Sequence, residues 1–165
     1  MTPAIWVHAI AAVAALFLGA YVLWRPKGDA AHKWTGRVWA GLMAVTALSS
    51  FGIREIFDGW FSPIHILSVY TLVTLVVAIH AIRNRDRIEH AVLKHQTEMK
   101  TLFASGMLIA GGFTFMPERL LGRLTFGETY PMINYVFVAL TASIGAYVFW
   151  RGGRAARALR KRAKG

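Results

Sequence analysis

Long apolar runs separated by short charged segments dominate this chain. An α-helix needs about 20 apolar residues to cross a bilayer, and the runs are close to that length or extend to it through polar turns. We therefore predict an all-α polytopic membrane bundle of five transmembrane helices, residues 1–150, followed by a basic cytoplasmic tail, residues 151–165. The predicted spans are about 3–24, 34–55, 63–82, 97–116 and 131–150.

Residues that typically begin or end helices lie between these apolar runs. Asp29 precedes the second run and is a typical N-cap, whose side chain accepts from the first backbone N–H groups of a helix. Pro63 and Pro131 stand where the third and fifth helices should open, and proline is favoured in a first turn. Pro117 should end the fourth helix.

Composition supports a membrane protein and excludes several chemistries. Apolar residues make up 56% of the chain and charged residues 16%, against about 45–50% and 25% in soluble domains. The chain has no cysteine, which excludes disulfides, thiolate metal sites and covalent haem attachment. No hydrolytic or nucleotide-binding motif is present, so we expect electron transfer at most as an enzymatic role.

The distribution of basic residues predicts the topology. With five crossings, 16 of the 19 Lys and Arg residues fall on one side, in 25–37, 83–100 and the tail. The other side holds Arg54, Arg119 and Arg123. By the positive-inside rule the amino terminus is outside and the carboxyl terminus inside. The location expected is a bacterial inner membrane, crossed several times.

His8 is predicted to point into the bundle. It shares a helical stripe with the small residues Ala12, Ala15 and Gly19. Small residues mark helix–helix contacts in membranes. The opposite stripe is bulky and should face lipid; it consists of Trp6, Ile10, Val13, Phe17 and Trp24.

His65 and His80 should lie near opposite ends of the third helix. Their separation of 15 residues places them within about 60° of each other and about 22 Å apart along the axis. This layout resembles that of membrane b-type cytochromes, which hold haem between imidazoles of facing helices. We therefore expect haem b ligation by His8 with His65 at the outer face, and by His80 with His95 or His32 at the inner face.

A non-catalytic role is the competing interpretation. Histidines in membranes also cap and cross-link helices, and the chain could be an accessory subunit, a scaffold or a small-molecule permease. In that case small-residue faces mediate assembly, at Gly106, Ala110 and Gly111 and at Ala142 and Ala146.

The expected partners are membrane lipids, together with other membrane proteins or further copies of the chain. The tail carries seven cations in fifteen residues, which suits topological anchoring and anionic headgroups. Binding to nucleic acid is not expected, because no aromatic residues interleave these charges. Trp6, Trp24, Trp34, Trp60 and Trp150 lie near span boundaries and should form an aromatic belt.

The chain resembles an uncharacterised bacterial membrane-protein family, domain of unknown function 2306. The resemblance rests on four elements: residues 32–39 (HKWTGRVW), His8, residues 61–68 (FSPIHILS) and residues 117–123 (PERLLGR). It also includes His95, although His90 could take the family's inner-loop position instead, because the flanking residues depart from the family pattern. The resemblance implies a small polytopic inner-membrane protein and implies no activity.

Overall fold

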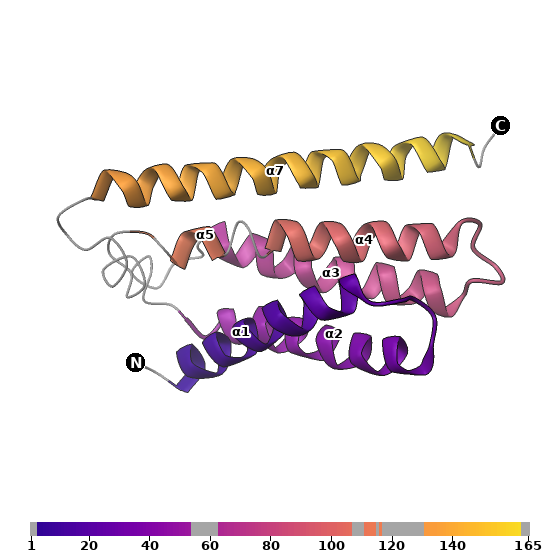
Figure 1. The fold of residues 1–165 in the computed structure, drawn as a ribbon, viewed down its shortest axis with the longest axis horizontal. Helices are drawn as coiled ribbons and strands as arrows, with labels where there is room; N and C mark the ends of the chain where they lie inside the picture. Colours follow the sequence, from indigo (N-terminus) through magenta and orange to yellow (C-terminus); the bar gives the residue numbers. More distant parts are fainter. Residues whose placement is uncertain (1–2, 54–62, 107–110, 115, 117–130, 163–165) are drawn as a thin grey trace. The chain divides into compact units, whose positions relative to one another are not determined.

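The computed structural model describes residues 3–53, 63–106, 111–114, 116 and 131–162. All secondary structure in these residues is helical (Figure 1). The chain forms two compact units, Met1–Ile79 and His80–Gly165, whose boundary falls inside helix α3. Arg54, Arg119 and Arg123, and the 117–123 element, lie outside the described residues.

Helices α1 (Pro3–Trp24) and α2 (Ala30–Ser50) form an antiparallel hairpin in the first unit. Its turn is held by charged side chains. Lys27 Nζ donates to the carbonyls of Val22 and Leu23 at 3.2 and 2.7 Å, where α1 ends and its carbonyls lack partners. Gly28 adopts a φ of 95°, a left-handed conformation that glycine reaches without a steric penalty.

Asp29 caps α2, as the sequence predicts. Its side chain accepts from the backbone N–H of His32 at 2.7 Å, and its other oxygen accepts from Arg25 at 2.7 Å. Both interactions lower the pKa of the Asp29 carboxyl below its ordinary value, and the hydrogen bond from the His32 N–H has the larger effect. The carboxylate therefore fixes both the start of α2 and the end of α1.

The two faces of α1 are sorted as predicted. Ala15 and Gly19 of the predicted inward stripe are buried together with Ala11 and Val22, whereas His8 and Ala12 are half-buried. Ala15 has no exposed surface. The bulky stripe is exposed throughout, with Phe17 70% and Trp24 93% exposed. The buried face of α2 recurs every three or four residues, at Trp39, Met43, Ala47 and Ser50.

Helix α3 (Pro63–Arg83) begins at the predicted proline and buries an unusual set of side chains. Its buried positions near the amino end are polar: His65, Ser68, Thr71 and Thr74. Ser68 Oγ lies 2.7 Å from Ser50 Oγ of α2. Polar side chains at membrane depth stabilise helix pairs when they find partners, so this hydroxyl contact joins the ends of α2 and α3.

The second unit contains α4 (Ala91–Ser105), α5 (Gly111–Thr114) and α7 (Pro131–Arg162), and α7 packs against both α4 and α5 (Figure 1). Helix α4 begins before the predicted span of 97–116, directly after His90. Helix α7 begins at Pro131 as predicted but continues into the tail to Arg162. The tail is rich in alanine and arginine, which are strong helix formers, and it contains no proline.

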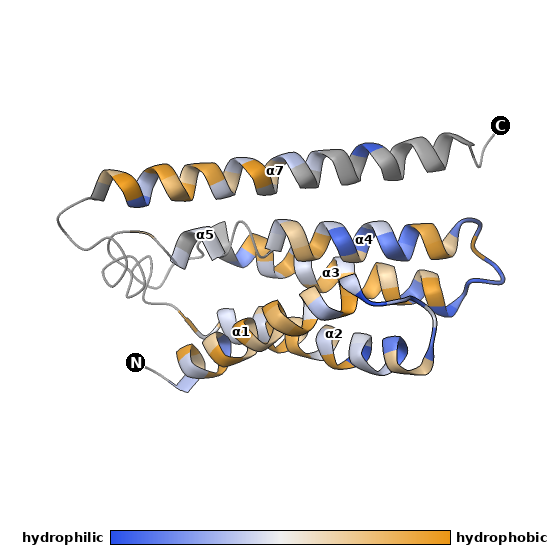
Figure 2. Ribbon diagram, viewed as in Figure 1, coloured by the Kyte–Doolittle hydropathy of each residue, from blue (hydrophilic) through white to orange (hydrophobic). Residues whose placement is uncertain are grey.

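Two described helices, Pro3–Trp24 and His65–Arg83, are long and apolar enough to cross a membrane. At 1.5 Å per residue, the 22 residues of α1 extend about 33 Å, slightly more than a hydrocarbon core of about 30 Å. A shorter apolar helical stretch covers Met132–Ile144. Figure 2 shows the apolar character of α1 and the hydrophilic turn between α1 and α2. The five-span arrangement stays a prediction.

Candidate functional site

His8 contacts the last turns of α2 from α1. Its Nδ1 lies 2.9 Å from the backbone oxygen of Thr46 and 3.3 Å from Ser49 Oγ. The side chain is half-buried. The small residues that follow it on the same stripe allow α1 and α2 to approach closely enough for this bond.

The bond to Thr46 fixes which ring nitrogen of His8 carries the proton. A carbonyl oxygen can only accept, so Nδ1 must donate. In a neutral imidazole the lone pair then belongs to Nε2. Histidines that bind metals have this arrangement, in which the second ring N–H donates to a backbone carbonyl and orients the ring. In this tautomer, Nε2 is the His8 atom that is able to ligate a metal.

His65 contacts the end of α2 from α3. It lies in the first turn of α3 and is 6% exposed. Its ring stacks on that of Phe51, the C-cap residue of α2, with centroids 5.4 Å apart and planes inclined by 29°. One turn further along α3, the Ser68 hydroxyl meets Ser50, so the first two turns of α3 are held against the same segment.

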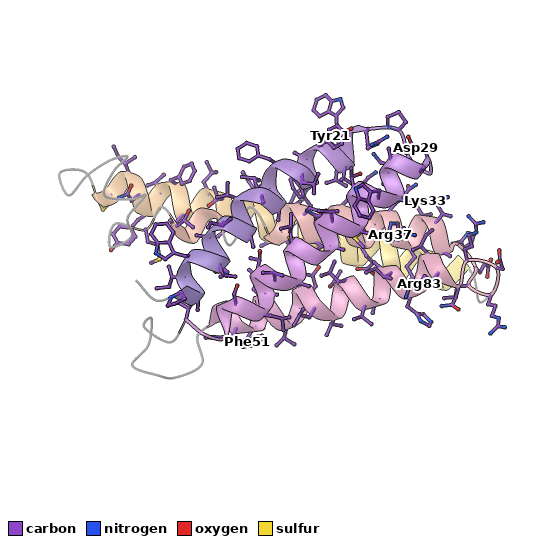
Figure 3. All side chains as sticks on the ribbon, turned by 90° about the horizontal axis from the view of Figure 1, so that it is seen from below. Tyr21, Asp29, Lys33, Arg37, Phe51 and Arg83 are labelled. Atoms are coloured by element: carbon purple, nitrogen blue, oxygen red, sulfur yellow. The ribbon has the colours of Figure 1, made fainter. Side chains whose placement is uncertain are left out.

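The carboxyl end of α2 thus brings both predicted outer histidines to one end of the first unit. His8 bonds to Thr46 and Ser49, and His65 stacks on Phe51, within six consecutive residues, 46–51. Figure 3 labels Phe51 at this end of α2. The same segment approaches the start of α1, because a Cβ on Gly52 would lie 3.1 Å from that of Ala4.

The remaining histidines belong to other segments of the chain. His32 is half-buried in the first turn of α2, and its backbone N–H is the one that Asp29 caps. His80 is exposed in the last turn of α3, with Asn84 Nδ2 3.4 Å from its Nδ1. His95 is half-buried on α4. The pairing of His80 with His95 or His32 stays a prediction.

His90, the alternative to His95, occupies a special backbone position. It is the N-cap of α4 and has a φ of 54°, a left-handed conformation that is uncommon for residues with a side chain. Its exposed Nε2 lies 3.2 Å from Glu89 Oε1. His90 therefore marks the start of a helix, whereas His95 lies within that helix. Among the described residues, no three His, Asp or Glu side chains are grouped as a metal site would require.

Trp39 is the residue of this region that the sequence pattern did not single out. It is 2% exposed, and its Nε1 donates to the backbone oxygen of Ala15 at 3.0 Å. The five tryptophans assigned to the aromatic belt lie near predicted boundaries, and the four of them whose surroundings are described are more than half exposed; Trp60 lies outside the described residues. Burial of Trp39 could have been predicted from its position inside an apolar run, at four-residue spacing from Met43 and Ala47 on the same helical face.

Comparison with known proteins identifies the family of this chain. The family described as Predicted membrane protein (DUF2306) matches residues 5–150. This range includes all six histidines and every described helix, apart from the first two residues of α1 and the last part of α7. No curated protein and no solved structure matches the chain.

Proposed function

We propose that this chain, which belongs to the DUF2306 family of predicted membrane proteins, binds haem b through His8 and His65 and transfers electrons within the membrane. The observation that carries the proposal is the hydrogen bond from His8 Nδ1 to the Thr46 carbonyl, because it presents Nε2 as a ligand atom. His65 lies against the same end of α2.

The donor set suits this cofactor. Two imidazoles are the axial ligands of b-type membrane cytochromes, and no cysteine or clustered carboxylate competes among the described residues. When bound, a haem with two imidazole ligands supplies one-electron redox chemistry.

The protein's own contribution is orientation and exclusion of water. Thr46 holds the His8 ring and keeps its proton on Nδ1. Phe51 covers one face of the His65 ring, and the burial of His65 removes it from solvent. Both effects reduce the rearrangement that ligand binding requires, and burial in an apolar medium raises the influence of nearby dipoles on the redox potential.

The finer membrane arrangement belongs to the same proposal. We place the amino terminus outside and the tail inside a bacterial inner membrane, with five crossings, on the sixteen-to-three division of basic residues. In this arrangement His8 and His65 lie at the outer face. His80, with His95 or His32, would form an inner pair about 22 Å away along α3.

A second function is favoured by a specific observation, the bond from Trp39 to Ala15. Trp39 and His8 make the same kind of side-chain-to-carbonyl contact between α1 and α2, and an indole cannot ligate iron. His8 could likewise serve only to join two helices, in a membrane accessory protein without a cofactor. Helix joining requires the N–H donor of His8, whereas ligation requires the lone pair of Nε2.

Substitution of His8 by Asn separates these functions. The Asn amide N–H can take the place of Nδ1–H and donate to Thr46, but it offers no imidazole. We expect the purified wild-type protein, after incubation with haemin, to show a Soret band and a bis-imidazole reduced-minus-oxidised spectrum. His8→Asn and His65→Phe should lose that spectrum, while the matched control His90→Asn, at an exposed histidine, should keep it.

Two results would overturn the haem proposal. One is wild-type protein that shows no Soret band and gains none with haemin. The other is an unchanged haem spectrum in both His8→Asn and His65→Phe. An unfolding midpoint that is unchanged in His8→Asn, together with the absence of a Soret band in the wild type, would instead support the helix-joining function.

A further inference from the structure

The turn end of the α1–α2 hairpin carries a positive charge that the described residues of the first unit do not neutralise. Residues 3–53 and 63–79 contain four cations, Arg25, Lys27, Lys33 and Arg37, and a single carboxylate, Asp29. Arg25 occupies one oxygen of Asp29, and the backbone of His32 occupies the other. Lys27 is committed to the carbonyls at the end of α1.

Lys33 and Arg37 form no ion pair with a carboxylate in the described part of this unit. Both are exposed, and they are four residues apart on α2, so they share one helical face about 6 Å apart along the axis. Like charges at this spacing repel each other. An anion between them would remove that repulsion and gain two charge-assisted hydrogen bonds. Figure 3 labels both residues on α2, beyond Asp29.

Exposed tryptophans place the two cations at the depth of lipid headgroups. Trp24 ends α1 and is 93% exposed, and Trp34 lies next to Lys33 and is 64% exposed. Indole rings are enriched at the interface between hydrocarbon and water. The apolar outward face of α1 adjoins this end of the hairpin. A ligand that approaches Lys33 and Arg37 here therefore comes from the membrane surface.

We propose that Lys33 and Arg37 form a binding site for the headgroup of an anionic phospholipid. The phosphate accepts hydrogen bonds from the Lys33 ammonium and the Arg37 guanidinium, while Trp34 contacts the glycerol region beside it. Asp29 fixes the first turn of α2 and so holds Lys33 in place. This site does not depend on His8 or His65, so the haem proposal can fail without affecting it.

The test measures lipid binding to the purified full-length chain in neutral detergent. Phosphatidylglycerol is titrated against the wild type and against Lys33→Gln/Arg37→Gln, and retained lipid is counted by native mass spectrometry. At the usual contribution of a cation near an anionic surface, the double variant should bind about 30-fold more weakly. Phosphatidylcholine, which has no net charge, and inorganic phosphate should bind much more weakly than phosphatidylglycerol to the wild type.

A matched variant controls for general attraction by net charge. Arg85→Gln/Arg87→Gln removes the same charge from exposed positions between α3 and α4, and it should retain most of the affinity. An equal loss in both double variants would overturn the local site, as would equal binding of phosphatidylcholine or of inorganic phosphate. Circular dichroism of both variants verifies that the helices are intact, so weaker binding cannot be confused with unfolding.

Discussion

His8 and Trp39 donate ring N–H groups in opposite directions across the α1–α2 hairpin. His8 Nδ1 lies 2.9 Å from the oxygen of Thr46, and Trp39 Nε1 lies 3.0 Å from that of Ala15. Donor and acceptor are seven residues apart on each helix, close to two turns, so they lie on the same face. Each helix therefore donates one hydrogen bond to the other, and the two bonds together fix the register of α1 against α2.

Replacement of Trp39 by Phe tests how much the hydrogen bond from Trp39 to Ala15 contributes to stability. The ring is retained but the donor is lost, so we expect a decrease of about 1 kcal/mol in the free energy of unfolding, measured by denaturant titration in micelles. Trp34→Phe is the control, because Trp34 lies on the same helix and is exposed. Equal effects of the two substitutions would show that the bond to Ala15 contributes nothing.

Ala15→Leu tests whether the small-residue stripe sets the distance between α1 and α2. Ala15 is fully buried, and a larger side chain there must push the helices apart, at a cost of about 1–3 kcal/mol. Ala20→Leu, at an exposed position of the same helix, should change the unfolding midpoint little. A variant at Ala15 that unfolds like the wild type would contradict this packing.

Gly112→Ala should destabilise the contact between α5 and α7. A Cβ at this position would overlap Thr141 Oγ1 and lie 3.2 Å from Thr141 Cβ. The expected decrease in unfolding free energy is about 1–3 kcal/mol, and the double variant Gly112→Ala/Thr141→Ala should recover much of it because the overlapping oxygen is removed. Gly111→Ala is the control, since a Cβ there would meet no atom within 4 Å.

The cap of α2 should give stability that depends on pH. The His32 N–H and Arg25 lower the pKa of Asp29 in the folded protein, so the charged form is favoured by folding. Its contribution is complete above the ordinary carboxyl pKa and is lost as the pH falls through the lowered folded value. The thermal midpoint of the wild type should therefore fall in acid relative to Asp29→Asn, which keeps a capping side chain without a titratable group. Parallel midpoint curves for the two proteins would contradict this role.

Helix boundaries were predictable where one local residue decides them. Asp29, Pro63 and Pro131 act on their own helix termini, and the structure has α2, α3 and α7 starting there. The faces of α1 followed from residue size, since lipid accepts bulky side chains and close helix contact requires small ones. The start of α4 was not predicted correctly because His90 adopts a left-handed backbone conformation, and the residue types around it do not indicate one.

The sequence by itself determined that the protein is helical, which face of α1 is buried and which side chains carry candidate chemistry, because these depend on residue type and on a fixed helical period. Only the tertiary structure decided that Thr46 accepts a hydrogen bond from His8, that Trp39 donates one to Ala15, and that the ring of Phe51 stacks on that of His65. These contacts join residues from different helices. Their partners depend on the register in which the helices pack, and a helical period read along one chain does not specify that register.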